Sequence, residues 1–226
     1  MNRTLIFDAD DTLWENNIYF ESAFEEFCEF LDHSTLTPAQ IRQALDDIEI
    51  VNRETHGYGA LNFGRNMAQC YRHLCEREVT PEDIDRVMGF ARRILDQPVQ
   101  LIEGVEETLT ALARRNRLML FTKGHPDEQR MKVDASGLAH LFAHVAIVKE
   151  KNVASYAELV AEHGLEKACT WMIGNSPRSD INPALELGLG AVWVPHPRTW
   201  SLEHEEVKPN GRLIVVEKFT DLLKVF

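Results

Sequence analysis

The first strand that the hydrophobic pattern predicts is short and ends at carboxylates. An apolar run covers residues 5–7, and Asp8, Asp10 and Asp11 follow it directly. A buried core does not accept unpaired carboxylates, so the strand must end where they begin. Because side chains alternate along an extended chain, Asp8 and Asp10 project to the same side. We therefore expect two like charges close together at a strand end, an arrangement that needs a cation, a shared proton or both.

After Trp14 the hydrophobic period lengthens to that of a helix and keeps that length up to Leu95. The first helix can be capped by Asn16 or Asn17. Two later helices open with a threonine cap followed by proline at the first helical position. Amphipathic helices in direct succession predict a small helical bundle. The apolar stripes cover residues 20–31, 41–51, 63–75 and 84–95, and the capping threonines are Thr37 and Thr80.

From residue 105 onward, short buried strands alternate with helices. This alternation predicts parallel βαβ units and an α/β sheet with helices on both faces. The strand at residues 5–7 belongs to this sheet, because alone it could not bury its two apolar faces. The helical bundle is then an insertion within the α/β core. Strands are predicted at residues 118–121, 145–148, 169–173, 191–194 and 213–216, and helices at 105–116, 126–136, 153–163, 180–187 and 220–225.

The composition is that of an ordinary globular protein, with 226 residues, 44% hydrophobic and 27% charged. A net charge of -12 argues against a nucleic-acid partner. It does not exclude a small anionic substrate, because a divalent cation and one lysine can reverse the sign inside a cleft. No apolar run is long enough to span a membrane, and the residues before the first strand leave no room for a secretion signal. The four cysteines are scattered along the chain and are predicted to be reduced packing residues. We therefore expect a cytoplasmic monomer or homodimer without membrane contact.

The sequence Asp-Ala-Asp-Asp-Thr that starts at residue 8 resembles the first signature of the haloacid dehalogenase-like hydrolase superfamily, in its phosphatase form Asp-x-Asp-x-Thr. The resemblance implies that Asp8 is the nucleophile and Asp10 the general acid/base. The alternative is a strand that ends in an acidic turn. The resemblance also implies a Rossmann-like parallel-sheet core, formed by residues 1–14 and 98–226, with an inserted α-helical cap domain at residues 15–97.

Ligands of open parallel sheets bind where the strands end, so the other strand ends supply the remaining candidates. The strand at residues 118–121 is followed by Thr122, Lys123 and Gly124. The Thr122 hydroxyl and the backbone N–H groups of Lys123 and Gly124 suit a phosphate oxygen. An ordinary turn is the alternative. The order of the motifs resembles the family's second signature and favours a phosphate-binding site.

The next strand is followed by two candidate lysines, Lys149 and Lys151. A lysine at this edge could neutralise the nucleophile and the transferred phosphoryl group, which is the role that the family assigns to its third signature. Lys151 directly precedes the predicted helix cap Asn152, which keeps it at the edge of the sheet, whereas Lys149 can still belong to the strand. We favour Lys151 as the catalytic lysine and keep Lys149 open.

The segment from Gly174 to Asp180 resembles the family's acidic signature, with Asn175 in place of its first aspartate. An amide oxygen can still bind Mg²⁺, but it brings no charge. We therefore expect weaker metal binding, which Asp180 must compensate directly or through a water. The predicted Mg²⁺ ligands are Asp8, the backbone carbonyl of Asp10, and Asn175, Asp180 or both. A Ser-Pro turn that leads into a helix is the structural alternative.

The predicted function is Mg²⁺-dependent hydrolysis of a small phosphorylated metabolite through an aspartyl-phosphate. The segment at residues 56–65, which connects two of the predicted helices, is expected to select the substrate, and Arg65 could bind a second anionic group there. An ordinary turn without a role in substrate binding is an equally reasonable interpretation of this segment. Three other functions stay open. A haloacid dehalogenase would lack an acid at the position of Asp10, a phosphomutase would keep every residue named, and a non-catalytic binding protein is supported only by Asn175.

Overall fold

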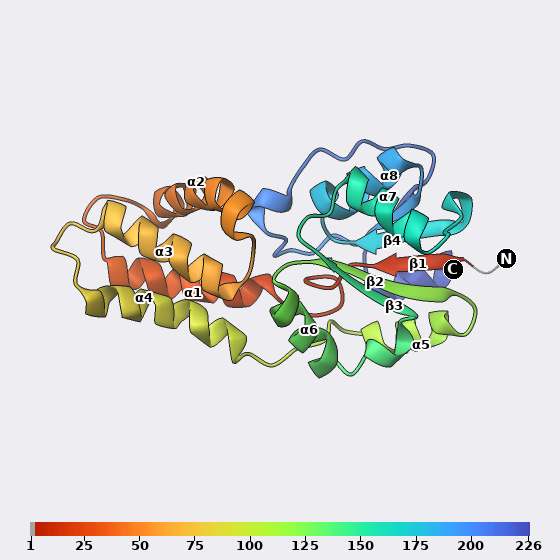
Figure 1. Cartoon of the computed structure of the whole chain (residues 1–226), viewed down its shortest axis with the longest axis horizontal. Coiled ribbons are helices and arrows are strands. Elements are labelled where there is room, and N and C mark those ends of the chain that lie inside the picture. The colour runs from red at the N-terminus through yellow and green to blue at the C-terminus, as the bar shows by residue number, and fades with distance from the viewer. Residues whose placement is uncertain (1–2) are drawn as a thin grey trace. The chain divides into compact units, whose positions relative to one another are not determined.

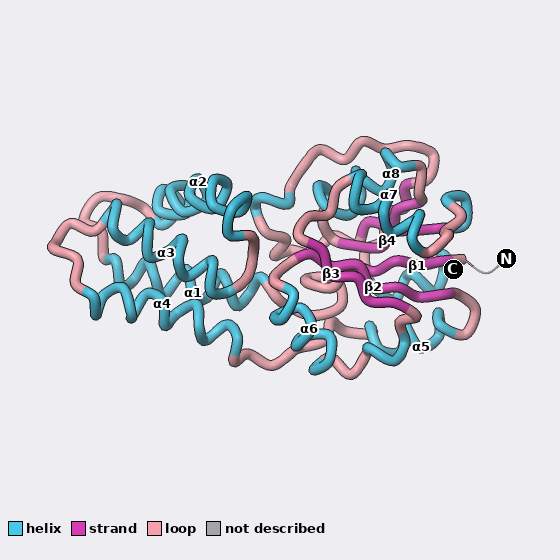
Figure 2. The backbone as a smooth tube through the Cα atoms, in the orientation of Figure 1, coloured by secondary structure: helices cyan, strands magenta, loops and turns pink. Residues whose placement is uncertain are grey.

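The computed structural model describes residues 3–226 of the chain. They form two compact units, one made of the N-terminal segment up to Asn17 together with residues 99–226, and one made of residues 18–98. Strands occur only in the first unit among the described residues, and the second is helical (Figure 2). We call them the α/β unit and the helical unit. The interpretation of the helical unit as a cap domain stays a prediction.

The described part of the α/β unit contains a six-stranded parallel sheet in the order β3-β2-β1-β4-β5-β6. Its strands are β1 (Thr4–Phe7), β2 (Arg117–Lys123), β3 (His144–Val148), β4 (Thr170–Gly174), β5 (Gly190–Trp193) and β6 (Leu213–Val215). β1 lies between β2 and β4, so the carboxylates that follow it lie at the centre of one edge of the sheet. The predicted α/β, Rossmann-like fold is confirmed.

Helices cover both faces of this sheet. They are α5 (Val105–Ala113), α6 (Pro126–Ala135), α7 (Val153–Glu162), α8 (Asn182–Leu187) and α9 (Leu222–Val225). Leu5 and Phe7 pack with α5, α6 and α9 on one face, whereas Ile6 packs with α7 and α8 on the other (Figure 1). This alternation along β1 buries both faces, as expected for a central parallel strand. The helix predicted at residues 180–187 is in fact one π-helical turn, Pro177–Ile181, followed by α8.

The helical unit contains four long helices in the described chain. They are α1 (Asn17–Leu31), α2 (Pro38–His56), α3 (Ala60–Leu74) and α4 (Pro81–Leu95). Thr37 and Thr80 cap α2 and α4 as predicted, and each forms a full capping box. The connection predicted at residues 56–65 is much shorter, since α3 begins at Ala60 and Arg65 lies within it. The prediction of a long loop was wrong because the glycines at its N-terminal end mark a short turn between two helices.

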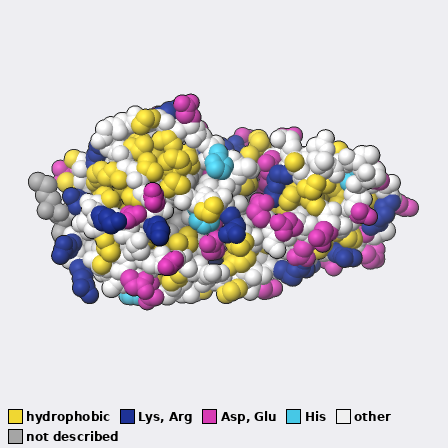
Figure 3. All heavy atoms as spheres, turned by 180° about the vertical axis from the view of Figure 1, so that it is seen from behind, with side chains coloured by type: hydrophobic (Ala, Val, Ile, Leu, Met, Phe, Trp, Pro, Cys, Tyr) yellow, Lys and Arg dark blue, Asp and Glu magenta, His cyan; other side chains and the backbone are white. Residues whose placement is uncertain are grey.

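Charged side chains of both signs are interspersed on the face of the molecule that Figure 3 shows. None of the helices among residues 3–226 combines the length and the apolar character that crossing a membrane would require. The four cysteines are free thiols, and Cys70 is buried. Cys28 and Cys75 pack against the same core as Cys70, so these three agree with their prediction as packing residues.

Candidate active site

The candidate site begins where β1 ends. The Asp8 N–H still donates to the Ile173 carbonyl at 2.9 Å, which continues the ladder with β4. Asp11 then takes a left-handed conformation (φ 58°), which aspartate tolerates better than most residues. The resulting tight turn returns the Thr12 hydroxyl to the start of the motif, where it donates to Asp8 Oδ2 at 2.9 Å. Asp8 is only 6% exposed, so its carboxylate is buried and depends on hydrogen-bond donors of the protein such as Thr12.

Lys151 connects the two aspartates of the site. Its Nζ lies 2.5 Å from Asp8 Oδ1 and 2.5 Å from Asp180 Oδ1, and its side chain is 1% exposed. Burial opposes the charge on this ammonium, but Asp180 and Asp8 outweigh it and raise the pKa of Lys151 above its ordinary value. Lys149, in contrast, is exposed. The geometry thus favours Lys151 over Lys149 as the lysine of the site.

Asp180 is fully buried and has both carboxylate oxygens engaged. Oδ1 accepts from Lys151, and Oδ2 accepts from the Ser176 N–H at 3.0 Å. Gly174 permits this approach, because a Cβ there would lie 2.2 Å from Asp180 Oδ2. Burial and the Asp8 charge raise the pKa of Asp180, against the pull of Lys151. Two carboxylates therefore share one ammonium group, and the cluster favours additional positive charge.

Asn175 lies beside Asp8, with its amide oxygen toward Thr12. The Thr12 hydroxyl is within 2.9 Å of Asp8 Oδ2 and 3.2 Å of Asn175 Oδ1, and it accepts the Asn175 backbone N–H at 3.1 Å. One hydroxyl proton cannot satisfy both oxygens. Either Asp8 Oδ2 or Asn175 Oδ1 therefore lacks the Thr12 proton, in a buried cluster that carries excess negative charge. A hard cation such as Mg²⁺ fits this set of oxygen ligands.

Asp10 contacts a different set of residues. Lys132 Nζ donates to its two carboxylate oxygens at 2.6 and 2.7 Å, Gln129 Nε2 donates at 2.8 Å, and Trp14 Nε1 donates at 2.7 Å. Gln129 also accepts from the buried Thr122 hydroxyl at 3.4 Å. We did not predict Lys132 and Gln129 as site residues. Their spacing of three on the helix that follows Gly124 was the available signal, because such residues share a helix face.

The Lys123 side chain is part of a separate buried network. Its ammonium pairs with Glu203, in the segment after β5, and donates to the Ser179 hydroxyl at 2.9 Å. Glu203 also accepts from the Ser176 hydroxyl at 2.5 Å. Burial opposes the Glu203 charge, but Lys123 and the two hydroxyls outweigh it and lower the pKa of Glu203. The network ties the end of β2 to the segment after β4, and no sequence motif indicated Glu203.

The predicted phosphate-binding segment is only partly available in the structure. The Gly124 N–H donates to the Val148 carbonyl at 3.1 Å, so it does not offer the phosphate donor that the sequence predicted. Gly124 has φ 149°, and a Cβ there would lie 2.7 Å from Gln129 Nε2. The glycine is therefore required by the close approach of Gln129 rather than by a free N–H group. Thr122 and the backbone N–H of Lys123 stay predictions for phosphate binding.

Arg65 belongs to the helical unit, where its guanidinium donates to Asn62 Oδ1 at 2.6 Å. Asn62 is buried and also donates to the Tyr58 carbonyl at 3.1 Å. This local network holds the start of α3. A role for Arg65 in substrate binding stays a prediction.

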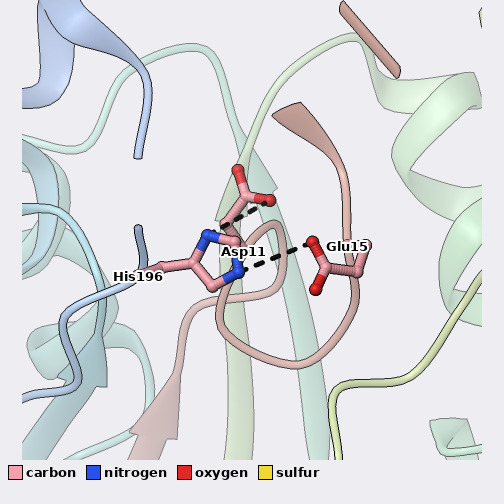
Figure 4. A group of neighbouring side chains, drawn as sticks. All are labelled: Asp11, Glu15 and His196. Carbon is pink, nitrogen blue, oxygen red and sulfur yellow. Dashed lines mark ion pairs between the residues drawn. The ribbon is translucent and has the colours of Figure 1, made fainter. Parts of the chain in front are cut away.

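Asp11, Glu15 and His196 form a further group, in which one possible ligand atom per residue lies within 4.8 Å of the others (Figure 4). His196 Nδ1 is 3.9 Å from Asp11 Oδ1, and its Nε2 is 3.5 Å from Glu15 Oε2. Burial raises the pKa of Asp11 to about 7 and lowers the pKa of His196. Asp11 Oδ1 also accepts the N–H groups of Asn16 and Asn17, at 2.9 and 3.1 Å. The cap that we predicted at Asn16 or Asn17 is thus supplied by Asp11, whose carboxylate has a local structural role.

A sequence model of the haloacid dehalogenase-like hydrolases matches residues 2–188 of the chain. The chain therefore belongs to the haloacid dehalogenase-like hydrolase family. This confirms the family predicted from the first signature and the assignment to a class of hydrolases.

Individual relatives agree with this assignment. The crystal structure of a haloacid dehalogenase-like family hydrolase from Xanthomonas campestris is 31% identical, with a TM-score of 0.87 over 99% of this chain and 90% of that one. The phosphoserine phosphatase of Thermus thermophilus is 33% identical over 114 residues, which are 47% of this chain and 45% of that protein. The pyrimidine 5'-nucleotidase YjjG of Escherichia coli is 24% identical over 84% of each chain. The match to the phosphoserine phosphatase thus spans less than half of that relative's length.

Proposed function

We propose that this protein is a Mg²⁺-dependent phosphatase that hydrolyses a small phosphomonoester through an aspartyl-phosphate at Asp8. The observation that carries the proposal is the buried Lys151 ammonium, 2.5 Å from Asp8 and from Asp180 at the carboxyl edge of the sheet. Such a cation can offset the charge of the nucleophile and of the transferred group. Two relatives named as a phosphatase and a nucleotidase support phosphomonoesters as the substrate class.

In the proposed reaction, a carboxylate oxygen of Asp8 attacks phosphorus while the bond to the leaving alkoxide breaks on the opposite side. Asp10 gives its proton to the alkoxide, and the alcohol leaves. Asp10 then takes a proton from the water that attacks the phosphorus of the aspartyl-phosphate, which releases phosphate and restores Asp8. Throughout, Lys151 holds Asp8 in place and offsets negative charge, and Thr12 orients the second Asp8 oxygen.

Three oxygen donors are proposed to hold the cation: the Asp8 carboxylate, the Asp10 backbone carbonyl and Asn175 Oδ1. When bound, Mg²⁺ would supply positive charge for the phosphoryl oxygens. Asp180 is less suited to direct coordination, because it is fully buried behind Lys151, whereas Asp8 and Asn175 are each 6% exposed. We therefore assign it the task of holding Lys151.

Asp10 must turn toward the leaving group in this mechanism, since its carboxylate now lies against Lys132, Gln129 and Trp14. Hydrogen bonds of catalytic groups are often aligned only after substrate binds. The protonated carboxyl that the first step needs accepts weaker hydrogen bonds from Lys132 than the ionised carboxylate does, so protonation would release Asp10 to turn.

Replacing Asp10 with asparagine is expected to lower kcat/KM for an alkyl phosphate by about 10²- to 10⁴-fold, the usual contribution of general acid/base catalysis. The loss should be smaller for p-nitrophenyl phosphate, because p-nitrophenolate leaves without a proton. Steady-state assays with both substrates check this. A loss of less than about threefold for the alkyl phosphate would mean that another residue moves the proton.

A substrate panel with and without Mg²⁺ tests the proposed function as a whole. We expect hydrolysis of p-nitrophenyl phosphate and of some metabolite phosphates, loss of this activity with a chelator, and its return with added Mg²⁺. Halide release from 2-haloacids would instead identify a dehalogenase, and phosphate transfer between hydroxyls of a sugar would identify a phosphomutase. No turnover on any panel member by a folded protein would favour a binding protein and contradict the proposal.

The substrate is proposed to be a small phosphorylated metabolite. The protein itself is proposed to act without a nucleic-acid or membrane partner. Arg65 remains the candidate for a second anionic group of that substrate. Comparing KM for mono- and bis-anionic phosphates in Arg65→Lys and wild type would show whether this guanidinium contributes to selection, since lysine keeps the charge but not the planar fork.

A further inference from the structure

In the turn at residues 196–199, which follows β5, the Thr199 hydroxyl uses its proton in a hydrogen bond within the turn. Thr199 donates to the His196 carbonyl through its backbone N–H at 3.1 Å and through its hydroxyl at 3.0 Å. The intervening Pro197 and Arg198 form the turn, and proline sets its backbone angle in advance. A carbonyl oxygen can only accept hydrogen bonds. The Thr199 hydroxyl therefore has only lone pairs left for any other neighbour.

That neighbour is the side-chain amide of Asn175. Its nitrogen lies 2.9 Å from Thr199 Oγ1, and both residues are buried, Thr199 being 9% exposed. Because Thr199 can only accept here, the half of the amide that faces it must be the NH₂ group. The amide oxygen is then turned to the other side, toward the Thr12 hydroxyl at 3.2 Å and the Asp8 carboxylate next to it.

The backbone of Asn175 is fixed independently of this contact. Its carbonyl accepts from Trp193 Nε1 at 3.0 Å, and its N–H donates to Thr12 Oγ1 at 3.1 Å. Neither bond selects between the two orientations of the amide, which have nearly the same shape. A flipped amide would direct an N–H group at the Thr12 hydroxyl and would offer no oxygen to a cation on that side. The bond to Thr199 is the contact that selects the orientation.

We infer that Thr199 is a positioning residue that holds the Asn175 amide with its oxygen toward the cation site. The inference rests on the proposed Mg²⁺ dependence and deepens it. At the position where this chain departs from the family's acidic signature, Thr199 then orients the amide that replaces the acid.

The test is the Mg²⁺ dissociation constant of the full chain, measured by titration calorimetry in the absence of substrate. Thr199→Val keeps the shape of the side chain and removes the acceptor, so Mg²⁺ binding should weaken by about tenfold or more, the usual effect of removing a residue that orients a metal ligand. Thr199→Ser keeps the hydroxyl and should bind nearly as wild type does. Thermal unfolding without Mg²⁺ checks folding, and Thr199→Ala replaces the valine variant should that not fold.

Two controls separate this role from a general structural one. In an Asn175→Ala background, Thr199→Val should cost no further affinity, because residues that act through one another are not additive. Glu15→Ala removes a side chain of the Asp11–Glu15–His196 group and keeps His196, whose Nδ1 accepts the Arg198 N–H at 3.3 Å within the turn that holds Thr199. This variant should retain wild-type affinity.

The outcomes distinguish the inference from the function on which it rests. Equal Mg²⁺ affinity in Thr199→Val and wild type, with Mg²⁺-dependent activity intact, would overturn the role of Thr199 alone. Loss of binding in Glu15→Ala would place the ion at the Asp11–Glu15–His196 group and would also overturn the role of Thr199. No Mg²⁺ binding by wild type, together with metal-independent turnover, would contradict both the inference and the proposed function.

Discussion

Asp8→Asn is expected to lower phosphatase activity by more than about 10⁴-fold, the scale seen when a catalytic nucleophile is removed. The amide that replaces the carboxylate cannot form an acyl phosphate by direct attack. The fold should persist, because Lys151 keeps its bond to Asp180, the amide oxygen can still accept from Lys151, and the amide NH₂ can donate to the Thr12 hydroxyl. Steady-state turnover of p-nitrophenyl phosphate and the unfolding midpoint measure the two effects.

Asp11→Asn is the matched control for that variant. It makes the same chemical change three residues further on, and its amide oxygen can still accept the N–H groups of Asn16 and Asn17. Asparagine also tolerates the left-handed conformation at this position. Activity should stay near that of wild type. Turnover near wild type in Asp8→Asn, or an equal loss in both variants, would refute the assignment of the nucleophile.

Lys151→Met is expected to lower the free energy of unfolding by about 3–5 kcal/mol, the usual cost of removing one partner from a buried ion pair. Asp8 and Asp180 would then face each other without the ammonium that now lies 2.5 Å from each. Activity should be lost as well, since no other buried cation among the described residues contacts Asp8. Urea denaturation and the phosphatase assay check the two expectations.

Two further variants show whether charge is the cause. Adding Asp180→Asn to Lys151→Met removes one of the two uncompensated carboxylates and should recover part of the lost stability, but not the activity. Lys149→Met changes an exposed lysine two positions away and should alter stability by no more than about 0.5 kcal/mol. A Lys151→Met protein as stable as Lys149→Met would contradict the geometry of the buried cluster.

The sequence was most informative where local physics dominates. An apolar strand that ends in carboxylates, and strands that alternate with helices, were sufficient for the α/β fold, because they reflect burial and backbone pairing. The cap at Asn152 and those at Thr37 and Thr80 were predicted correctly, since capping depends on adjacent residues. The same cap at Asn152 was the reason to prefer Lys151 over Lys149, and the geometry now supports that choice.

Contacts between distant segments could not be predicted in this way. Lys132 and Gln129 reach Asp10 from a helix more than one hundred residues further on, and no periodicity connects them. Glu203 and Thr199 lie in the segment after β5, whose course depends on turns and on the partners it meets. For the same reason the sequence showed Asn175 as a departure from the family pattern, but not the hydroxyl that orients its amide.

The most direct test of the central claim is chemical trapping of the aspartyl-phosphate. The Asp10→Asn variant is mixed with p-nitrophenyl phosphate and Mg²⁺, quenched, and reduced with borohydride, which converts a phosphorylated aspartate to homoserine. Because p-nitrophenolate leaves without an acid while breakdown of the intermediate lacks its base, the intermediate should accumulate. Peptide mass spectrometry should then show homoserine at position 8. Reduction at another residue, or an unmodified Asp8 during continued turnover, would contradict the account.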